Sequence, residues 1–488
     1  MPFPVGRQSN GGASTTVRLR GAISLLPRLL ALCCALLLAG RTLAGQPYQF
    51  GNPSPEEEWM RWLINRARLD PEAEADRLGI KNKHRQDVPN GTYDVGEGIK
   101  LTGVTNQRTY WSRYQGPRQV LAWSGPLNAA ARNHSDDMYV FDFFDDYTVQ
   151  STHGYTFNSA SYERAYAEGY PCHFVGENIT SSKPAGAYSP EEVHEDLFKD
   201  VGYPGRGNRR NLLHSYWREI GVGYISRRPN AGGWTDFWTV KFGSDAFVAQ
   251  GYDDPDPPVD TVFLTGVVFN DGNGDGQYQP GEQVPGVRVL AVGPAGPLKY
   301  YAITADGGGY SLPLVDAEGN DLLEGDSVEV IFIDPANHVF RRTTRQLQAG
   351  LVVFEDTNAP TPVSYYQRFN IGVDVLVDDF VPLPVGDANL DGVVDSADLA
   401  ILADHYHLTG ATWLEGDFNF DGFVGVADLS AIADNIAGLG DGELYDYAIS
   451  VVPEPTTAGL LLLALLPAGG LGLLSRRRRR PGSRQEGR

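Results

Sequence analysis

The feature that most constrains the fold is a thirteen-residue pattern that occurs twice near the end of the chain, at 387–399 and 417–429. Both copies place Asp, Asn and Asp at positions 1, 3 and 5, Gly at 6 and Asp at 12. This spacing is typical of a Ca²⁺ loop that runs into a helix, with a backbone carbonyl as ligand at position 7 and Gly permitting the sharp turn. Gly425 replaces Asp395 at position 9, so water is expected to fill that vertex in the second loop. The predicted ligands are Asp387, Asn389, Asp391, Val393, Asp395 and Asp398 in the first loop, and Asp417, Asn419, Asp421, Phe423 and Asp428 in the second.

The duplicated loop and helix, within residues 384–440, resemble a type I dockerin, a small all-α pair of EF-hand-like units. Apolar stripes on the two predicted helices agree with such a pair. The resemblance implies Ca²⁺-dependent docking to a cohesin-type partner. The alternative is a Ca²⁺-stabilised spacer without a partner.

Residues 260–380 consist of short runs with alternating apolar residues, separated by Gly, Pro and Asp, which predict an antiparallel β-sandwich. Its first turn, 271–282, also follows the Ca²⁺-loop spacing and closes with Glu at position 12. The predicted ligands are Asp271, Asn273, Asp275, Gln277, Gln279 and Glu282. The segment resembles the calcium-binding B-type stalk repeats of bacterial adhesins, also described as Cna-B-like or Sdr-like. The alternative is a merely acidic turn.

Both ends of the chain carry targeting patterns. Residues 1–45 place arginines before the apolar run 29–38 and then small residues, which predicts a signal peptide. The alternative is a retained anchor. At the other end, 452–480 holds Val-Pro-Glu-Pro, an apolar stretch and five arginines, and resembles a PEP-CTERM sorting signal. Such signals are processed by an exosortase, so an exosortase-like enzyme is an expected partner; the alternative is a permanent single-span transmembrane anchor. We therefore expect an exported protein at the cell surface, in the extracellular matrix or secreted.

Charge and cysteine content narrow the function further. The net charge of −21 repels nucleic-acid phosphates, so nucleic-acid binding is not expected. The chain is expected to meet the membrane only through its terminal segments. Of three cysteines, two lie in the predicted signal, which leaves Cys172 alone and excludes an internal disulfide framework.

Residues 46–245 contain four ordered phrases: Leu-Ile-Asn-Arg-Ala-Arg from 63, Leu-Asn-Ala-Ala-Ala from 127, Gly-Glu-Asn-Ile from 176, and Asn-Leu-Leu with Ile-Gly-Val-Gly from 211 to 223. Together they resemble the CAP superfamily (cysteine-rich secretory proteins, antigen 5, pathogenesis-related 1) in its bacterial SCP-like form. The resemblance implies an α-β-α sandwich with a central cleft. The fold class expected for the whole chain is multidomain: this sandwich, the antiparallel β-sandwich and the small all-α pair.

In that family the cleft gathers two histidines and two acidic residues, a set suited to Zn²⁺. The resemblance maps His153 and Glu177 onto the first histidine and the first acid, and Asp200 or Glu195 onto the second acid. Asn208 stands where the second histidine is expected, so Zn²⁺ in the cleft should be weakly bound or absent. Two alternatives remain: His214 replaces the missing imidazole, or His153 and Glu177 only hydrogen-bond the loop backbone. His134 and His194, on predicted helices, are interpreted as polar-face residues.

No catalytic residues are predicted. The expected function is that of an exported, surface-sorted protein that binds a small or glycan ligand in its CAP cleft and docks through its Ca²⁺ loops. The alternative is a hydrolytic component of an extracellular polysaccharide-degrading assembly. A glycosidase needs two carboxylates flanking one bond, and the sequence offers no such pair.

Overall fold

The computed structural model describes residues 45–80, 93–94, 99–100, 118–171, 174–182, 188–201, 207–214, 217–244, 261–354 and 363–436. The predicted signal peptide up to residue 44, Cys172 and the predicted sorting signal at 452–480 lie outside these residues. The described residues belong to one compact unit, Leu43–Arg488. Within them no helix is both long and apolar enough to cross a membrane.

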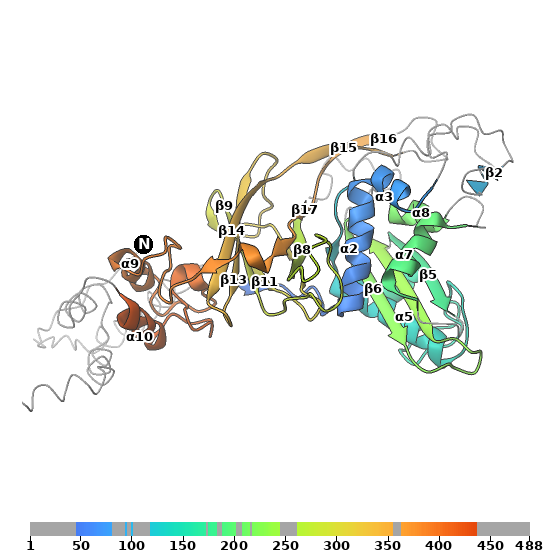
Figure 1. The fold of residues 1–488 in the computed structure, drawn as a ribbon, viewed down its shortest axis with the longest axis horizontal. Coiled ribbons are helices and arrows are strands. Elements are labelled where there is room, and N and C mark those ends of the chain that lie inside the picture. Colours follow the sequence, from blue (N-terminus) through green and yellow to red (C-terminus); the bar gives the residue numbers. More distant parts are fainter. Residues whose placement is uncertain are drawn as a thin grey trace, which may run out of the picture. The chain divides into compact units, whose positions relative to one another are not determined.

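The first helix, α2 (Pro55–Leu69), begins with a capping box in which Ser54 and Glu57 satisfy each other's backbone N–H groups. Asp70 ends it and caps α3 (Pro71–Arg77), because its side-chain oxygen accepts a hydrogen bond from Ala73 N–H. Both helices start at a Ser-Pro or Asp-Pro pair, because Pro fits the first helical turn. Helix α2 lies beside strand β6 of the sheet that follows (Figure 1).

A four-stranded sheet, in the order β4-β6-β7-β5, forms the middle layer of this first part. Residues of β6 and β7 share a buried core with α2 and α7, whereas α5 packs on both strands from the side of the β6 glycines. This arrangement is the expected α-β-α sandwich. Its remaining elements are β4 (Ala122–Trp123), α5 (Gly125–Val140), α6 (Ser161–Ala167), β5 (Val175–Ser182), α7 (Pro190–Lys199), α8 (Gly207–Leu212), β6 (Glu219–Ser226) and β7 (Asp236–Gly243).

Positions 221 and 223 of β6 require glycine because the backbone of α5 lies directly against them. A Cβ at Gly221 would stand 2.1 Å from the Leu127 carbonyl carbon, and one at Gly223 would stand 2.2 Å from that of Ala131. Both contacts are to backbone, which cannot rotate away.

We therefore expect Gly221→Ala to lower the free energy of unfolding by about 1–3 kcal/mol, the cost of overpacking a filled interior. Urea denaturation measures this loss. The matched control is Gly207→Ala, because a Cβ there meets no atom of the described residues within 4 Å. Equal stability of the two variants would contradict the close packing of α5 on β6.

The second part is a β-sandwich. Its larger sheet has seven strands in the order β1-β11-β9-β13-β14-β19, with β10 beside β9, and its smaller sheet has the order β12-β8-β17, with β18 beside β8. The strands are β1 (Gln46–Pro47), β8 (Phe263–Phe269), β9 (Arg288–Gly293), β10 (Gly296–Pro297), β11 (Tyr300–Ile303), β12 (Gly309–Pro313), β13 (Ser327–Asp334), β14 (Val339–Gln346), β17 (Ile371–Gly372), β18 (Val375–Leu376) and β19 (Val381–Pro382). Two further hairpin pairs are β2 (Tyr93–Asp94) with β3 (Ile99–Lys100) and β15 (Ala349–Phe354) with β16 (Val363–Arg368).

The predicted antiparallel order holds for the main strands but not throughout. β1 pairs with β11, and β17 and β18 pair with β8, in parallel. These short strands reach their neighbours from distant parts of the chain rather than through a hairpin, and only a hairpin imposes the antiparallel direction. Gln46 and Pro47, which precede the CAP-like phrases, thus belong to the sandwich.

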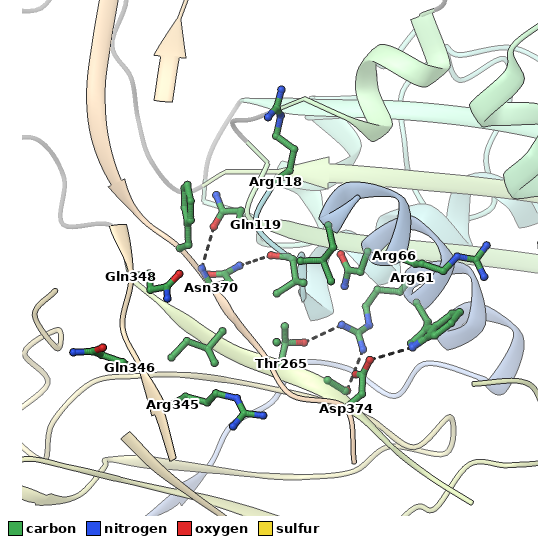
Figure 2. Close-up of a pocket in the computed structure, with 18 residues that line it drawn as sticks. Arg61, Arg66, Arg118, Gln119, Thr265, Arg345, Gln346, Gln348, Asn370 and Asp374 are labelled. Atoms are coloured by element: carbon green, nitrogen blue, oxygen red, sulfur yellow. Dashed lines mark hydrogen bonds between the residues drawn. The ribbon is translucent and has the colours of Figure 1, made fainter. Parts of the chain in front are cut away.

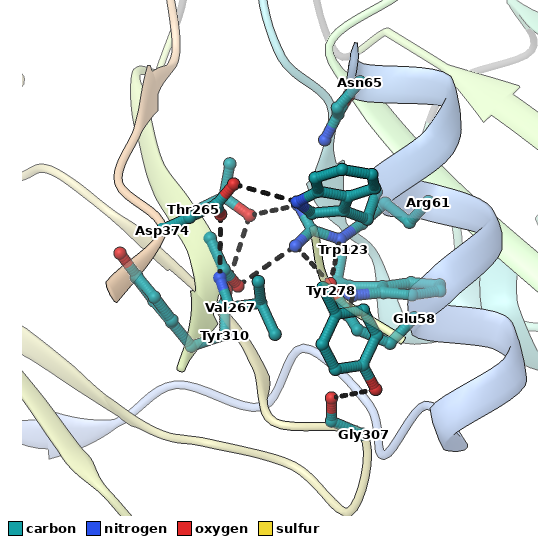
Figure 3. A network of polar contacts seen from close by, with 12 residues as sticks. Glu58, Arg61, Asn65, Trp123, Thr265, Val267, Tyr278, Gly307, Tyr310 and Asp374 are labelled. Atoms are coloured by element: carbon teal, nitrogen blue, oxygen red, sulfur yellow. Dashed lines mark hydrogen bonds and ion pairs between the residues drawn. The ribbon is translucent and has the colours of Figure 1, made fainter. Parts of the chain in front are cut away.

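A buried polar network joins α2 to the sandwich (Figure 3). Arg61 forms an ion pair with Glu58 and donates to Thr265 Oγ1 and Gly266 O, both at 3.0 Å. Trp123 N–H donates to Ser311 Oγ at 2.8 Å. One continuous apolar core also includes side chains of α2 and β8. The two parts therefore share an interior instead of being joined only by a linker.

The C-terminal module consists of two loops, each followed by a helix: α9 (Ser396–Asp404) and α10 (Val426–Asn435). Short 3₁₀ turns lie at Val377–Asp379 and Trp413–Glu415. Leu399 and Ile432 of the two helices, together with Trp413, share a core with Ile331 and Phe340 on the outer side of the sandwich sheet. The module is thus supported by the sandwich.

Candidate functional site

Glu177, the predicted first acid of the cleft, lies on β5 between two cations. Its side chain is only 4% exposed; Arg164 Nη2 lies 2.6 Å from Oε1, and Lys241 Nζ contacts Oε2. Burial alone would raise the pKa of Glu177, but Lys241 and Arg164 outweigh it and lower the pKa to about 2. The carboxylate is therefore ionised, and the positive charges of Arg164 and Lys241 already balance its negative charge.

The two cations are fixed from several sides. Lys241 pairs with Glu177 across strands β7 and β5 and also donates to Ser161 Oγ at 2.9 Å. Burial lowers the pKa of Lys241 to about 8, although Glu177 opposes this shift. Arg164 donates to Thr148 Oγ1 at 3.2 Å and Asp146 O at 2.8 Å. We call Glu177, Arg164, Lys241 and the neighbouring His134 the Glu177 cluster.

The prediction that His134 lies on the polar face of its helix is wrong, because this residue is fully buried. Its Nε2 lies 3.1 Å from Asp145 O, and its buried Nδ1 has no hydrogen-bond partner among the residues that the structure describes. Burial, with Arg164 and Lys241 nearby, lowers the pKa of His134 to about 3, so the ring is neutral. His194 is buried too, with Nε2 2.9 Å from Glu74 Oε1, because α7 turns this face onto α2 and α3.

His153, the predicted first histidine, has different partners. Its Nε2 lies 3.2 Å from Asp136 Oδ2 and 3.9 Å from Asp137 Oδ1, and its side chain is 29% exposed. Asp136 also pairs with Arg227 at 2.8 Å. Asp137 accepts from Thr152 N–H at 2.8 Å, which fixes the loop before His153.

The remaining predicted cleft residues form a third group. Asn208 donates through its backbone N–H and its Nδ2 to the two oxygens of Asp200, at 2.9 and 3.0 Å. Asn178, beside Glu177 on β5, donates to Asn208 O at 3.0 Å. Glu195 contacts Lys199 one turn later on α7. Asn208 thus connects the end of α7 to the start of α8.

His214 packs against aromatic rings, with centroids 6.5 Å from Phe174 and 5.1 Å from Trp217. Burial and neighbouring arginines lower its pKa to about 4. Taken together, the predicted cleft residues fall into separate hydrogen-bonded groups. Across the described ranges, no three His, Cys, Asp or Glu side chains are gathered closely enough to hold a metal ion.

The residues that sequence reasoning missed are Arg164 and Lys241. Lys241 lies inside the strand β7, all of whose residues are buried. A lysine in such a strand indicates a buried acidic partner, because an unpaired charge there would cost too much free energy. Identifying that partner requires the register between β5 and β7.

The three predicted Ca²⁺ loops share one hydrogen-bond pattern. In each, the Asp at position 1 accepts from the N–H of the Gly at position 6, and the acid at position 12 accepts from the N–H at position 9. The position-6 glycines have left-handed φ angles: Gly276 (+72°), Gly392 (+90°) and Gly422 (+81°). The bonds to position 1 are Gly276 to Asp271 (2.8 Å), Gly392 to Asp387 (2.8 Å) and Gly422 to Asp417 (2.9 Å). Those to position 12 are Gln279 to Glu282, Asp395 to Asp398 and Gly425 to Asp428, all 2.9 Å.

Carboxylates in these loops are crowded. Burial and the carboxylates of Asp428 and Asp421 raise the pKa of Asp417 to about 6. Burial and the carboxylates of Asp398 and Asp391 raise the pKa of Asp387, and burial with the carboxylate of Asp421 raises the pKa of Asp428. Ionising all of these acids without a cation therefore costs free energy.

Comparison with known proteins yields one family and two structures. Residues 64–242 match the family described as CAP, the cysteine-rich secretory protein family. An extracellular protein containing an SCP domain from Bacillus anthracis str. Ames is 21% identical, with a TM-score of 0.21, over 28% of this chain and 38% of that one. An outer surface protein from Borrelia burgdorferi is 12% identical, with a TM-score of 0.20, over 25% of this chain and 77% of that one.

The match with the Bacillus protein spans well under half of that protein's length. None of the curated proteins compared with the chain matches it. The family match covers the three-layer part of the fold and every residue of the Glu177 cluster. Residues 64–242 of this longer chain are therefore a CAP domain.

Proposed function

We propose that the protein is an exported binding protein whose CAP cleft takes a small or glycan-type ligand without a transition metal. The observation that carries this proposal is the position of Glu177 between Arg164 and Lys241. A divalent cation at Glu177 would be repelled by both neighbours in a buried site, where Coulomb interactions are weakly screened. The carboxylate serves as an internal counter-ion, and its role is to hold β5, β7 and α6 together.

The same proposal assigns Ca²⁺ to the three C-terminal loops. The side chains that would hold it are the Asp, Asn and Glu oxygens at positions 1, 3, 5 and 12, an all-oxygen set that suits Ca²⁺ and not Zn²⁺. Bound Ca²⁺ supplies the positive charge that the crowded carboxylates need. The shared loop conformation supports this assignment, because the backbone is already turned around each loop centre.

Export and docking complete the proposal. The support for export is the basic and apolar pattern of 1–45 and the Pro-Glu-Pro pattern of 452–480. The support for docking to a cohesin-type partner is the repeat of loop and helix at 387–399 and 417–429. Processing by an exosortase-like enzyme would release the apolar tail, and mass spectrometry of the surface form would then find a chain lacking Arg488.

The metal-free cleft is tested by restoring the missing imidazole. We expect Asn208→His to leave Zn²⁺ binding weak, because Glu177 remains neutralised and His153 remains paired with Asp136. Calorimetric titration of the purified chain with Zn²⁺ measures this. Adding Lys241→Met to Asn208→His removes one competing cation and should raise Zn²⁺ affinity, provided that circular dichroism shows an unchanged fold. One tightly bound equivalent of Zn²⁺ in Asn208→His with Lys241 intact would refute the proposal.

A further inference from the structure

A cavity lies away from the Glu177 cluster, where α2 meets the sandwich (Figure 2). Its volume is about 540 Å³, within the range of small-molecule sites. Its walls come from α2, the segment before β4, strand β8, the end of β14 and the start of β17. Arginines at positions 61, 66, 118 and 345 line it, and Asp374 is the only acid among the lining residues.

The inner wall of this pocket is rigid because its polar groups are already bonded. Asn370 Nδ2 donates to Val120 O at 3.0 Å and Arg218 O at 2.8 Å, and its Oδ1 accepts from Phe263 N–H at 3.0 Å. Asn65 Nδ2 donates to Leu121 O at 3.2 Å. A pocket whose wall needs no rearrangement loses little conformational entropy when a ligand binds.

Arg61 and Arg66 are paired with acids within the protein. Arg61 is paired with Glu58, and Arg66 is paired with Glu74 at 3.0 Å. Asp374 is also engaged, since Oδ2 accepts from Trp62 Nε1 at 3.1 Å and Oδ1 from Val267 N–H at 3.1 Å. These paired groups form the wall of the pocket, and Arg345 lies at its rim.

Arg345 supplies cationic donors at the rim. Its Nη1 donates to Thr343 Oγ1 at 2.6 Å and Thr344 O at 3.0 Å, and within the described part of the chain no carboxylate pairs with it. Gln346 and Gln348, both exposed, add amide groups beside it. The chain has a net charge of −21, so the positive charge of Arg345 beside this pocket is opposite in sign to the charge of the protein as a whole.

We propose that this pocket binds a small anionic ligand of about disaccharide size, whose carboxylate, sulfate or phosphate group is bound by the Arg345 guanidinium. In Figure 2, Arg118 lies at the other end of the labelled residues from Arg345, and its Nε donates to Leu213 O at 3.3 Å. Guanidinium groups bind such oxyanions through charge-assisted and often bidentate hydrogen bonds. The exposed amides of Gln346 and Gln348 suit the hydroxyl groups of a sugar. This site is separate from the CAP cleft and does not depend on the function proposed for it.

The test is calorimetric titration of the purified chain with four probes: digalacturonate, the neutral disaccharide lactose, sodium sulfate and inorganic phosphate. We expect digalacturonate to bind and lactose not to bind. Arg345→Gln should weaken digalacturonate binding by about tenfold or more, the usual effect of losing one charge-assisted contact. The matched control is Arg342→Gln on the same strand, which removes the same charge from an exposed side chain outside the pocket.

Binding of sulfate or phosphate alone, lost in Arg345→Gln and kept in Arg342→Gln, would support the anion site and identify a free oxyanion as its ligand. The absence of binding by every anionic probe would overturn the proposal. So would equal losses in the two variants, because those would indicate attraction by overall charge. Melting temperatures of both variants confirm that each one is folded.

Discussion

Removal of Ca²⁺ by a chelator is expected to lower the melting temperature of the C-terminal half by several degrees. A ligand present at one hundred times its Kd stabilises the folded state by roughly 2.7 kcal/mol per site, and each kcal/mol shifts the melting temperature of a domain of 150–250 residues by about 2–4 °C. The reason is the crowding of Asp387, Asp417 and Asp428 described above. Differential scanning calorimetry with and without chelator measures the shift.

The stabilisation by Ca²⁺ should also depend on pH. The folded pKa of Asp417, about 6, lies above its unfolded value, so the Ca²⁺-free folded state binds an extra proton and loses stability as the pH rises from about 4 to 6. Ca²⁺ requires the ionised carboxylate and reverses this loss. The Ca²⁺-dependent shift should therefore be full above pH 6 and vanish as the pH falls toward 4.

Variants locate the effect. Asp387→Ala and Asp417→Ala should each remove one site and reduce the Ca²⁺-dependent shift, whatever they do to the baseline melting temperature. Asp404→Ala is the matched control, because Asp404 is an exposed acid at the end of α9, outside both loops. An identical Ca²⁺ response in all three variants would refute the assignment of the loops.

Arg61→Met is expected to lower the free energy of unfolding by about 3–5 kcal/mol, because it leaves the buried charge of Glu58 without its partner. The variant also loses the hydrogen bonds to Thr265 and Gly266 that join α2 to the sandwich. Chemical denaturation measures the loss. The matched control is Arg228→Met, since Arg228 is exposed and should change stability by no more than about 0.5 kcal/mol.

The pH dependence distinguishes this mechanism from lost packing. Burial, opposed by Arg61 and Trp123, raises the pKa of Glu58 to about 7. Without Arg61 this pKa rises further, so the folded chain keeps the proton on Glu58 at pH 8 while the unfolded chain releases it, and the cost of folding grows between pH 5 and pH 8. The destabilisation by Arg61→Met should accordingly be larger at pH 8. The double variant Glu58→Gln, Arg61→Met should recover part of the loss, and a failure of both results would contradict an ion pair shared by the two parts.

Local features were predictable from the sequence. The capping box at Ser54 and the cap at Asp70 depend on residues three positions apart, and the structure contains both. The strands β6 and β7 follow from alternation over eight residues. The family match at 64–242 confirms the CAP resemblance, which also depends on short phrases.

Features that depend on long-range register were not predictable. Lys241 lies opposite Glu177 only because β5 and β7 pair in one particular register across 64 positions. Glu58 and Arg61 have the spacing of an exposed helical ion pair, and they are buried because β8, Trp123 and the start of β12 pack on α2. The predicted cleft histidine His153 pairs with Asp136 on α5 and not with Glu177, and this pairing also depends on how distant segments pack.

We propose that this protein binds Ca²⁺ in its three acidic loops and no transition metal in its CAP cleft. The most direct test is elemental analysis of the purified chain after dialysis against equal, buffered concentrations of Ca²⁺ and Zn²⁺. We predict up to three equivalents of Ca²⁺, one for each loop, and no stoichiometric Zn²⁺. One equivalent of Zn²⁺ that disappears in Glu177→Gln, with Ca²⁺ near zero, would contradict the account.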